Sequence, residues 1–227
     1  MLILQTFYKK IRWPLCCLIF LFSCRQAKDN TDIASFKEDT LAKKAFVQRA
    51  FIDINKAEKF VQNGDIITRT GNDFTSQSLK ALNQRDKTFS HCGIASIEND
   101  SVFVYHALGG DWNPNQKIRR DPFISFAEPY SNNEIGIFRF DIDTSLINNI
   151  LNTAKHYYRS GITFDMDFDL ATDNKMYCAE YVYKSLKNGS KGKLQFPLSH
   201  IGTFEFIGVD DIILHPLCKK KLHVVYK

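Results

Sequence analysis

Two histidines lie where a predicted β-hairpin would bring them together. His91 and His106 belong to two strand-like runs joined at Asn99-Asp100, a pair that favours a tight turn. With these two residues as the turn, Gly93 faces His106, so His91 and His106 are diagonal neighbours on one face. Two imidazoles placed this way can act as a base and the group that orients it. A register slip of one residue would separate them, and an isolated strand histidine is more often structural.

Cys178 is the candidate nucleophile. A thiol attacks only as its thiolate, and the positive end of a helix and a nearby imidazolium both lower a thiol pKa. Free backbone N–H groups at a helix start can also stabilise the oxyanion of an acyl-transfer intermediate. Taken alone, a cysteine on an amphipathic helix is usually a packing residue. Cys178 lies at or near a predicted helix start, in the sequence Tyr177-Cys178-Ala179-Glu180-Tyr181-Val182.

These residues carry a resemblance to a known family. The segments 89–94 (FSHCGI) and 177–182 (YCAEYV) resemble the two motifs of the permuted NlpC/P60 cysteine hydrolases, in particular the YiiX/YebB-like group of the papain-like superfamily. The segment 64–66 (GDI) resembles the start of that domain, and 163–165 (TFD) resembles the segment before the cysteine. The resemblance covers about residue 60 to the C-terminus, with histidine before cysteine, the reverse of unpermuted relatives.

The resemblance implies a role for each residue. Cys178 would attack a carbonyl group to form a thioester, and His91 would act as general base and acid. His106 would fill the position of the orienting polar residue, which varies in the family. Phe164 stands where relatives often have tyrosine, which puts a hydroxyl role there in doubt. The implied fold is α+β, a papain-like domain in permuted order with helices packed on an antiparallel sheet or small barrel, without cofactor or metal.

The N-terminus resembles a bacterial lipoprotein signal. Basic residues precede an apolar stretch, residues 13–22, that is too short to span a bilayer. The stretch ends in Leu-Phe-Ser-Cys24, which resembles the lipobox at which a cysteine is acylated and the chain is cut. We therefore expect residues 1–23 to be a signal peptide and lipidated Cys24 to anchor the exported protein in the cell envelope. The alternative is an ordinary signal peptide, or an uncleaved anchor, with a chance cysteine.

Charge and cysteine content agree with export. Without residues 1–23 the formal net charge falls from +5 to +2, so the basic composition requires no nucleic-acid partner. Beyond Cys24 only Cys92, Cys178 and Cys218 remain, and an odd number in an oxidising compartment leaves at least one thiol unpaired. Cys92 is expected in the core, and a disulfide between Cys92 and Cys218 is left open.

The order of predicted elements indicates one α+β domain, residues 33–227, after a polar tether at 24–32. Residues 33–62 are expected to form one or two amphipathic helices, and 72–87 a loop with a helical turn. Strands are predicted at 65–69, 91–97, 101–107 and 135–140, with strands and turns after residue 189. One helix is predicted to start at Asp143 or Thr144 and to end by Gly161, and another to start at Asp173 or Asn174 and to carry Cys178.

Two acidic features are expected to be structural. Asp165, Asp167 and Asp169 alternate as calcium ligands do, but the rest of the calcium-loop pattern is absent. Glu180, beside the candidate nucleophile, is expected to cap the helix or to form an ion pair.

Together these features predict a lipid-anchored envelope hydrolase that cleaves an amide bond, with a peptide such as the cell-wall stem peptide as the expected substrate. Two alternatives stay open. The same residues could act on a lipid or small-molecule acyl group, as hydrolase or acyltransferase. The chain could also be a lipoprotein that binds envelope peptides without cleaving them.

Overall fold

The computed structural model describes residues 30–110 and 113–227. It consists of a short unit that ends at Asp39 and a large unit, Thr40–Lys227. Helix α1 (Asn30–Glu58) begins inside the segment predicted as a tether and crosses from one unit to the other. The predicted signal peptide and Cys24 lie outside the described residues. None of the helices within the described ranges is long and apolar enough to cross a membrane.

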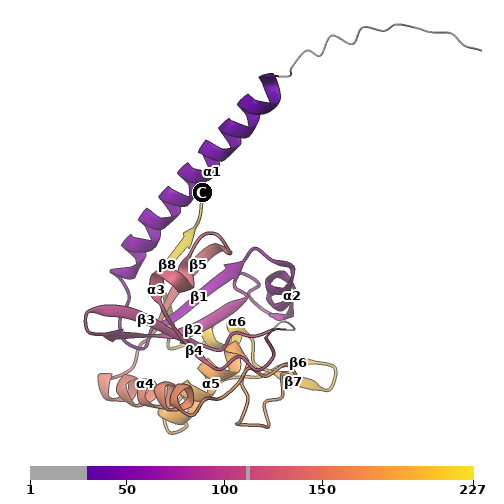
Figure 1. Cartoon of the computed structure of the whole chain (residues 1–227). Helices are drawn as coiled ribbons and strands as arrows, with labels where there is room; N and C mark the ends of the chain where they lie inside the picture. The colour runs from indigo at the N-terminus through magenta and orange to yellow at the C-terminus, as the bar shows by residue number, and fades with distance from the viewer. Residues whose placement is uncertain (1–29, 111–112) are drawn as a thin grey trace, which may run out of the picture. The chain divides into compact units, whose positions relative to one another are not determined.

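The large unit is built on an antiparallel sheet (Figure 1). Within the described residues six strands form this sheet in the order β4-β3-β2-β1-β5-β8, and β6 and β7 form a separate hairpin. The strands are β1 (Ile66–Gly71), β2 (His91–Glu98), β3 (Ser101–His106), β4 (Arg119–Pro122), β5 (Asn132–Phe140), β6 (Ser199–Ile201), β7 (Phe204–Phe206) and β8 (Cys218–Val225). The helices that follow α1 are α2 (Phe74–Leu82), α3 (Phe123–Ala127), α4 (Thr144–Arg159), α5 (Cys178–Gly189) and α6 (Val209–Ile213).

The predicted register of the β2–β3 hairpin is confirmed. Glu98 pairs with Ser101, and the pairing continues to Ile94 opposite Tyr105, which places Gly93 beside His106. The two turn residues, Asn99 and Asp100, have φ values of 48° and 61°. Two successive positive φ values are the requirement of a type I′ turn, whose twist matches that of the strands it joins. A Cβ on Gly93 would lie 2.9 Å from the Cβ of His106, so the absence of a side chain there makes room for the imidazole.

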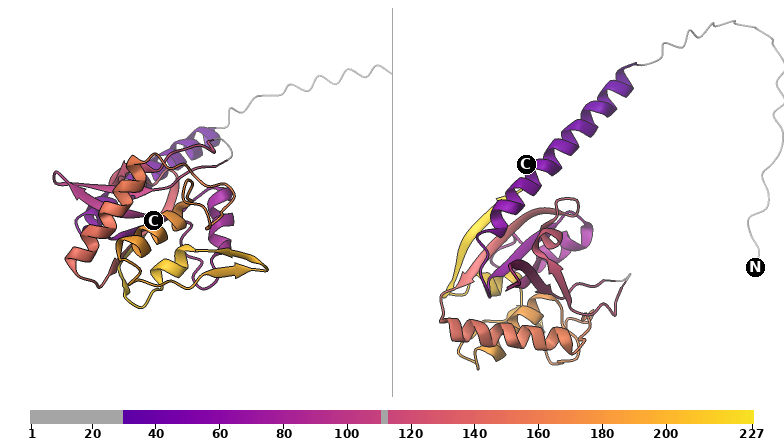
Figure 2. Two further views of the ribbon diagram at one scale, coloured as in Figure 1. Left: turned by 90° about the horizontal axis from the view of Figure 1, so that it is seen from below. Right: turned by 60° about the vertical axis from the view of Figure 1, so that its left-hand side comes forward.

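Helices cover both faces of the sheet. On one face Ile66, Ile94 and Tyr105 pack against α4, α5 and α6, and Figure 2 shows α4 and α5 side by side there. On the other face Ile67 and Ala95 pack against α3 and the second half of α1. Because side chains alternate along a strand, His91 and Cys92, adjacent at the start of β2, face opposite layers. The apolar positions that predicted the N-terminal helix, Ala50, Ile54, Ala57 and Val61, are all buried.

Several local predictions differ from the structure. The helix that carries the cysteine begins at Cys178, so the predicted cap at Asp173 or Asn174 is wrong. Asp173 instead receives a hydrogen bond from Lys184, and Glu180 caps the helix. The predicted start of α4 is confirmed, with the Asp143 side chain accepting from the N–H of Leu146. The sequence did not predict α3, β4 or α6, all of them short and therefore without a full period of apolar residues.

Candidate active site

The two predicted histidines form a hydrogen-bonded pair on the sheet. His91 Nε2 lies 2.8 Å from His106 Nδ1, and the two rings meet edge to face. His106 is fully buried, and His91 is 7% exposed. Phe126 of α3 packs against both rings, so the pair has an apolar cover on the side away from the sheet.

A third residue, Asp121 on β4, completes a chain of hydrogen bonds. Its Oδ2 lies 3.0 Å from His106 Nε2 and also forms an ion pair with Arg119. Asp121 pairs in register with Val104, so it is the diagonal neighbour of His106, just as His106 is of His91. The chain Asp121–His106–His91, here called the relay, thus extends across three adjacent strands.

The relay fixes the proton positions on both rings. The carboxylate of Asp121 can only accept, so His106 carries its proton on Nε2 and presents the Nδ1 lone pair. His91 must then donate from Nε2, which leaves the lone pair on its Nδ1. No hydrogen bond to His91 Nδ1 is found within the described residues, so this nitrogen is free to accept a proton.

Burial keeps both imidazoles neutral. Burial lowers the pKa of His91 well below its usual value, and the positive charges of Arg69 and Arg119 act in the same direction. Burial also lowers the pKa of His106 to about 4, against the hydrogen bond from Asp121 that acts to raise it. For Asp121, burial acts to raise the pKa, but the partners His106 and Arg119 hold it below its usual value. At neutral pH the relay is a carboxylate followed by two neutral imidazoles.

Cys178 is the first residue of α5, and its side chain contacts the sheet through a hydrogen bond with Cys92 of β2. The hydrogen bond from the Cys92 side chain lowers the pKa of Cys178, burial acts to raise it, and backbone N–H groups of Cys92, Ala179 and Cys178 lower it further. The net effect is a pKa below the usual thiol value. Across the described chain no hydrogen bond joins the Cys178 sulfur to His91. The structure therefore brings Cys178 to the residue that follows His91, with the thiol directed to Cys92.

Glu180 holds the start of this helix. Its Oε2 accepts a hydrogen bond from the N–H of Tyr177, and its Oε1 lies 2.9 Å from Lys184 Nζ. Burial raises the pKa of Glu180 to about 7, although Lys184 acts to lower it. Both structural roles expected for this residue, capping and ion pairing, are present, but the ion pair is buried rather than on the surface.

A cavity of about 550 Å³ opens beside the base. His91 and Arg69 are polar residues of its wall, and α2 contributes part of its rim. The apolar part of the wall comes from α2 and from the loops that follow β3 and precede α5: Leu79, Leu82, Leu108, Phe164, Met166 and Phe168. The polar part includes Asp73, Ser76 and Asn132. Phe164 thus forms part of an apolar wall and packs closely against Gly109.

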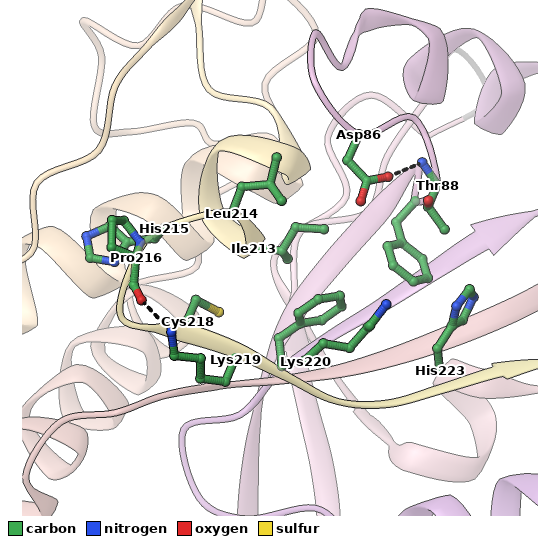
Figure 3. Close-up of a pocket in the computed structure, with 12 residues that line it drawn as sticks. Asp86, Thr88, Ile213, Leu214, His215, Pro216, Cys218, Lys219, Lys220 and His223 are labelled. Atoms are coloured by element: carbon green, nitrogen blue, oxygen red, sulfur yellow. Dashed lines mark hydrogen bonds between the residues drawn. The ribbon is translucent and has the colours of Figure 1, made fainter.

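The other candidate residues lie away from the relay. Within the described residues Cys92, Cys178 and Cys218 are all free thiols, so the disulfide left open between Cys92 and Cys218 is not formed. Cys218 lines another cavity, of about 360 Å³, beside His215 and Lys219 (Figure 3), and burial raises its pKa to about 12. The oxygens of Asp165 accept hydrogen bonds from the backbone of Asp167 and Asp169, so they shape the loop that carries them.

Sequence reasoning missed Asp121 and Arg69. Residues 119–122, Arg-Arg-Asp-Pro, are charged and end in proline, so no strand was predicted there. The alternation of side chains along strands could have indicated Asp121. A third strand that pairs with the second strand of the hairpin would place the side chain of Asp121 diagonally from His106. Arg69 lies opposite His91 on β1, a pairing that the sequence does not encode locally.

Comparison with known proteins supports the fold. No protein-family model matches the chain, and no curated protein matches it. The structure is similar to the crystal structure of the metalloprotein YiiX from Escherichia coli O157:H7, described as DUF1105, with a TM-score of 0.57 and 18% sequence identity. The similarity covers 73% of this chain and 97% of that chain. At this identity the likeness shows the fold alone: an α+β, YiiX-like fold.

The neighbour's description as a metalloprotein raises the question of a metal in this chain. No group of three or more His, Cys, Asp or Glu side chains within residues 30–110 and 113–227 is placed to hold a metal ion. In the relay the ring nitrogens point at one another and at Asp121, rather than toward a common centre. The described residues therefore do not fit a metal, and we assign no step to one.

Proposed function

We propose that this chain is a cysteine hydrolase of the permuted NlpC/P60 type, with Cys178 as nucleophile and His91 as general base. The observation that carries the proposal is the relay, because it leaves a lone pair on His91 Nδ1 at the end of the strand that α5 contacts. Thioester chemistry requires a neutral imidazole with an oriented lone pair and a thiol of lowered pKa at a helix start, and here the thiol contacts Cys92, the residue that follows His91.

The reaction follows from these positions. The Cys178 side chain turns from Cys92 toward His91, whose Nδ1 takes the thiol proton. The thiolate attacks the carbonyl carbon, and backbone N–H groups at the start of α5 stabilise the oxyanion. His91 returns the proton to the leaving amine, and a thioester remains on Cys178. A water that His91 deprotonates then attacks the thioester and releases the acid and the thiol.

The first test is the pH dependence of alkylation at Cys178, followed by mass spectrometry of its peptide. With iodoacetamide we expect a reactive thiolate well below pH 8 in the wild type and a higher thiol pKa in His91→Ala, where the hydrogen bonds from Cys92 and the helix start remain but the base is lost. Cys92→Ala serves as the control for the other thiol contact, and it should raise the pKa of Cys178 without removing its dependence on His91. Equal alkylation profiles in the wild type and His91→Ala would refute the pair.

The substrate class is a separate part of the proposal. We expect an amide bond in a cell-envelope peptide such as the cell-wall stem peptide, because an exported protein meets that substrate. The apolar walls of the cavity favour a second candidate, an acyl hydrolase or acyltransferase that uses the same residues. Release of amine or of fatty acid from model substrates by the wild type, with Cys178→Ala as the inactive control, distinguishes the two. Binding of envelope peptides without any turnover would support the third possibility, a binding lipoprotein.

The membrane anchor is likewise proposed from the sequence. Labelling of expressing cells with an alkyne-bearing fatty acid should modify the wild type and not Cys24→Ser. Labelling that persists in Cys24→Ser would exclude Cys24 as the lipidation site.

A further inference from the structure

The wall of the cavity beside His91 contains one cation, Arg69, and one carboxylate, Asp73, whose two oxygens accept hydrogen bonds from Ser76 at the start of α2 and form no salt bridge with Arg69 within the described residues. Arg69 lies on β1 opposite His91 and lines this cavity. Its Nη1 donates a hydrogen bond of 2.7 Å to the backbone oxygen of Phe126, and the guanidinium lies 4.5 Å from the centre of the Phe126 ring. These two contacts hold the side chain in place.

The guanidinium has donors to spare. An arginine carries five N–H groups in a planar fork, and the bond to Phe126 uses one of them. Arg69 forms no salt bridge within the part of the chain that the structure describes. Other arginines of the same unit do pair with a carboxylate: Arg85 with Asp211, Arg119 with Asp121, Arg120 with Glu98 and Arg139 with Asp65.

A buried guanidinium without a directly bonded carboxylate is electrostatically unfavourable. Burial lowers the pKa of Arg69, and although Asp121, Glu128 and the Cys178 thiolate act to raise it, the pKa remains below its usual value. A partly buried cation without a directly bonded anion is destabilising unless a ligand supplies the partner. A carboxylate is the natural partner, because it accepts two parallel N–H bonds from the guanidinium fork.

We propose that Arg69 binds a carboxylate of the ligand, while the apolar wall formed by α2 and the loops before α5 takes an adjacent apolar group. The ligand class is therefore an anionic molecule with a carboxylate next to an aliphatic or aromatic group. This inference deepens the proposed function, since it names the substrate chemistry of the same cavity.

The experiment measures binding in the Cys178→Ala background, where turnover cannot interfere. Two probe pairs separate the sources of the carboxylate: decanoate against decanamide, and N-acetyl-leucyl-leucine against its C-terminal amide. In each pair the ligands differ in charge and share the apolar part. Calorimetric titration is carried out on Cys178→Ala, on Cys178→Ala with Arg69→Gln, and on Cys178→Ala with Lys80→Gln. Lys80 lies on α2 outside the cavity wall, so its variant removes the same charge without touching the site.

We expect at least one carboxylate to bind about tenfold or more tighter than its amide, with this preference lost in Arg69→Gln and kept in Lys80→Gln. The probe pair that shows the preference identifies whether a fatty acid or a peptide fits the cavity. Arg69→Lys keeps the charge without the fork, so a carboxylate preference in this variant that is weaker than that of the parent supports the proposal even if Arg69→Gln fails to fold. An unchanged preference in Arg69→Gln, or no preference in either pair, would overturn it. Because the background lacks the nucleophile, neither result depends on whether Cys178 is catalytic.

Discussion

At the scale of single residues, the placement of Asp121 decides what His91 can do. A carboxylate at the far end of the relay determines on which nitrogen each imidazole holds its proton. The lone pair on His91 Nδ1, the proposed base, therefore depends on a residue that is two strands away and forms no hydrogen bond with His91.

Replacing Asp121 with asparagine tests this dependence. The amide can donate to His106 Nε2, which would move the proton of His106 to Nδ1 and that of His91 onto its Nδ1. We expect kcat to fall by about 10- to 100-fold with KM unchanged, since the group acts through another residue. Asp141→Asn, an exposed change of the same kind, should retain wild-type kinetics. A fall confined to KM would argue for a role in substrate binding instead.

The buried imidazoles also make stability depend on pH. The pKa of His106 is about 4 in the folded protein and about 6.5 in the unfolded chain, so between these values the unfolded chain binds more protons. The free energy of unfolding should therefore fall as the pH is lowered from about 6.5 to about 4, by about 3 kcal/mol for this residue alone. The lowered pKa of His91 acts in the same direction.

Urea unfolding at pH 7 and pH 4.5 measures this slope. His106→Gln should show a shallower loss of stability than the wild type, whereas His156→Gln, which changes an exposed histidine of α4, should follow the wild type. Parallel slopes for the wild type and His106→Gln would show that His106 is not the group that titrates.

At the scale of elements, the β2–β3 hairpin shows how much of the site the sequence encodes locally. The turn residues fix the register, and the register places both histidines, so this part was predictable from a short stretch of chain. The position of Cys178 near a helix start also followed from its own segment, although the helix begins later than the polar residues Asp173 and Asn174 suggested.

The rest of the site depends on contacts between distant segments. Asp121 is joined to His106 only through the pairing of a short, charged strand, and Arg69 reaches the cavity through the pairing of β1 with β2. The pairing of Glu180 with Lys184 is local, four residues apart on α5, and only its burial depends on the surrounding elements. Local patterns of hydrophobicity do not carry this information.

The turn offers a prediction of stability. Asp100 has a positive φ, which an L-residue adopts at a cost and glycine does not. Asp100→Gly should raise the free energy of unfolding by about 0.5–1 kcal/mol and leave activity unchanged, as measured by urea unfolding and turnover. Asp141→Gly, at a residue without a positive φ, should instead leave stability unchanged or lower it. Loss of stability in Asp100→Gly would mean that the aspartate side chain, rather than the backbone, sets the turn.

At the scale of the whole molecule, the sheet places the histidines and the cysteine of the candidate site in separate layers. The histidines lie on the face covered by α1 and α3, and the cysteine approaches from the face covered by α4 and α5. The two layers of site residues come together at the start of β2, where His91 and Cys92 are consecutive. The YiiX-like fold thus positions groups that are 87 residues apart in sequence through a single strand end.

The position of β4 has a dynamic consequence. This strand has four residues, lies at the edge of the sheet and pairs within the described chain with β3 alone. Short edge elements open by local fluctuation long before the whole domain unfolds. Each such opening would break the hydrogen bond between His106 and Asp121, while the hydrophobic clusters on the two faces of the sheet stay packed. Heating should therefore reduce the activity of the proposed base, His91, at temperatures where the rest of the molecule is still folded. The short edge strand β4 would then set the highest temperature at which the protein works.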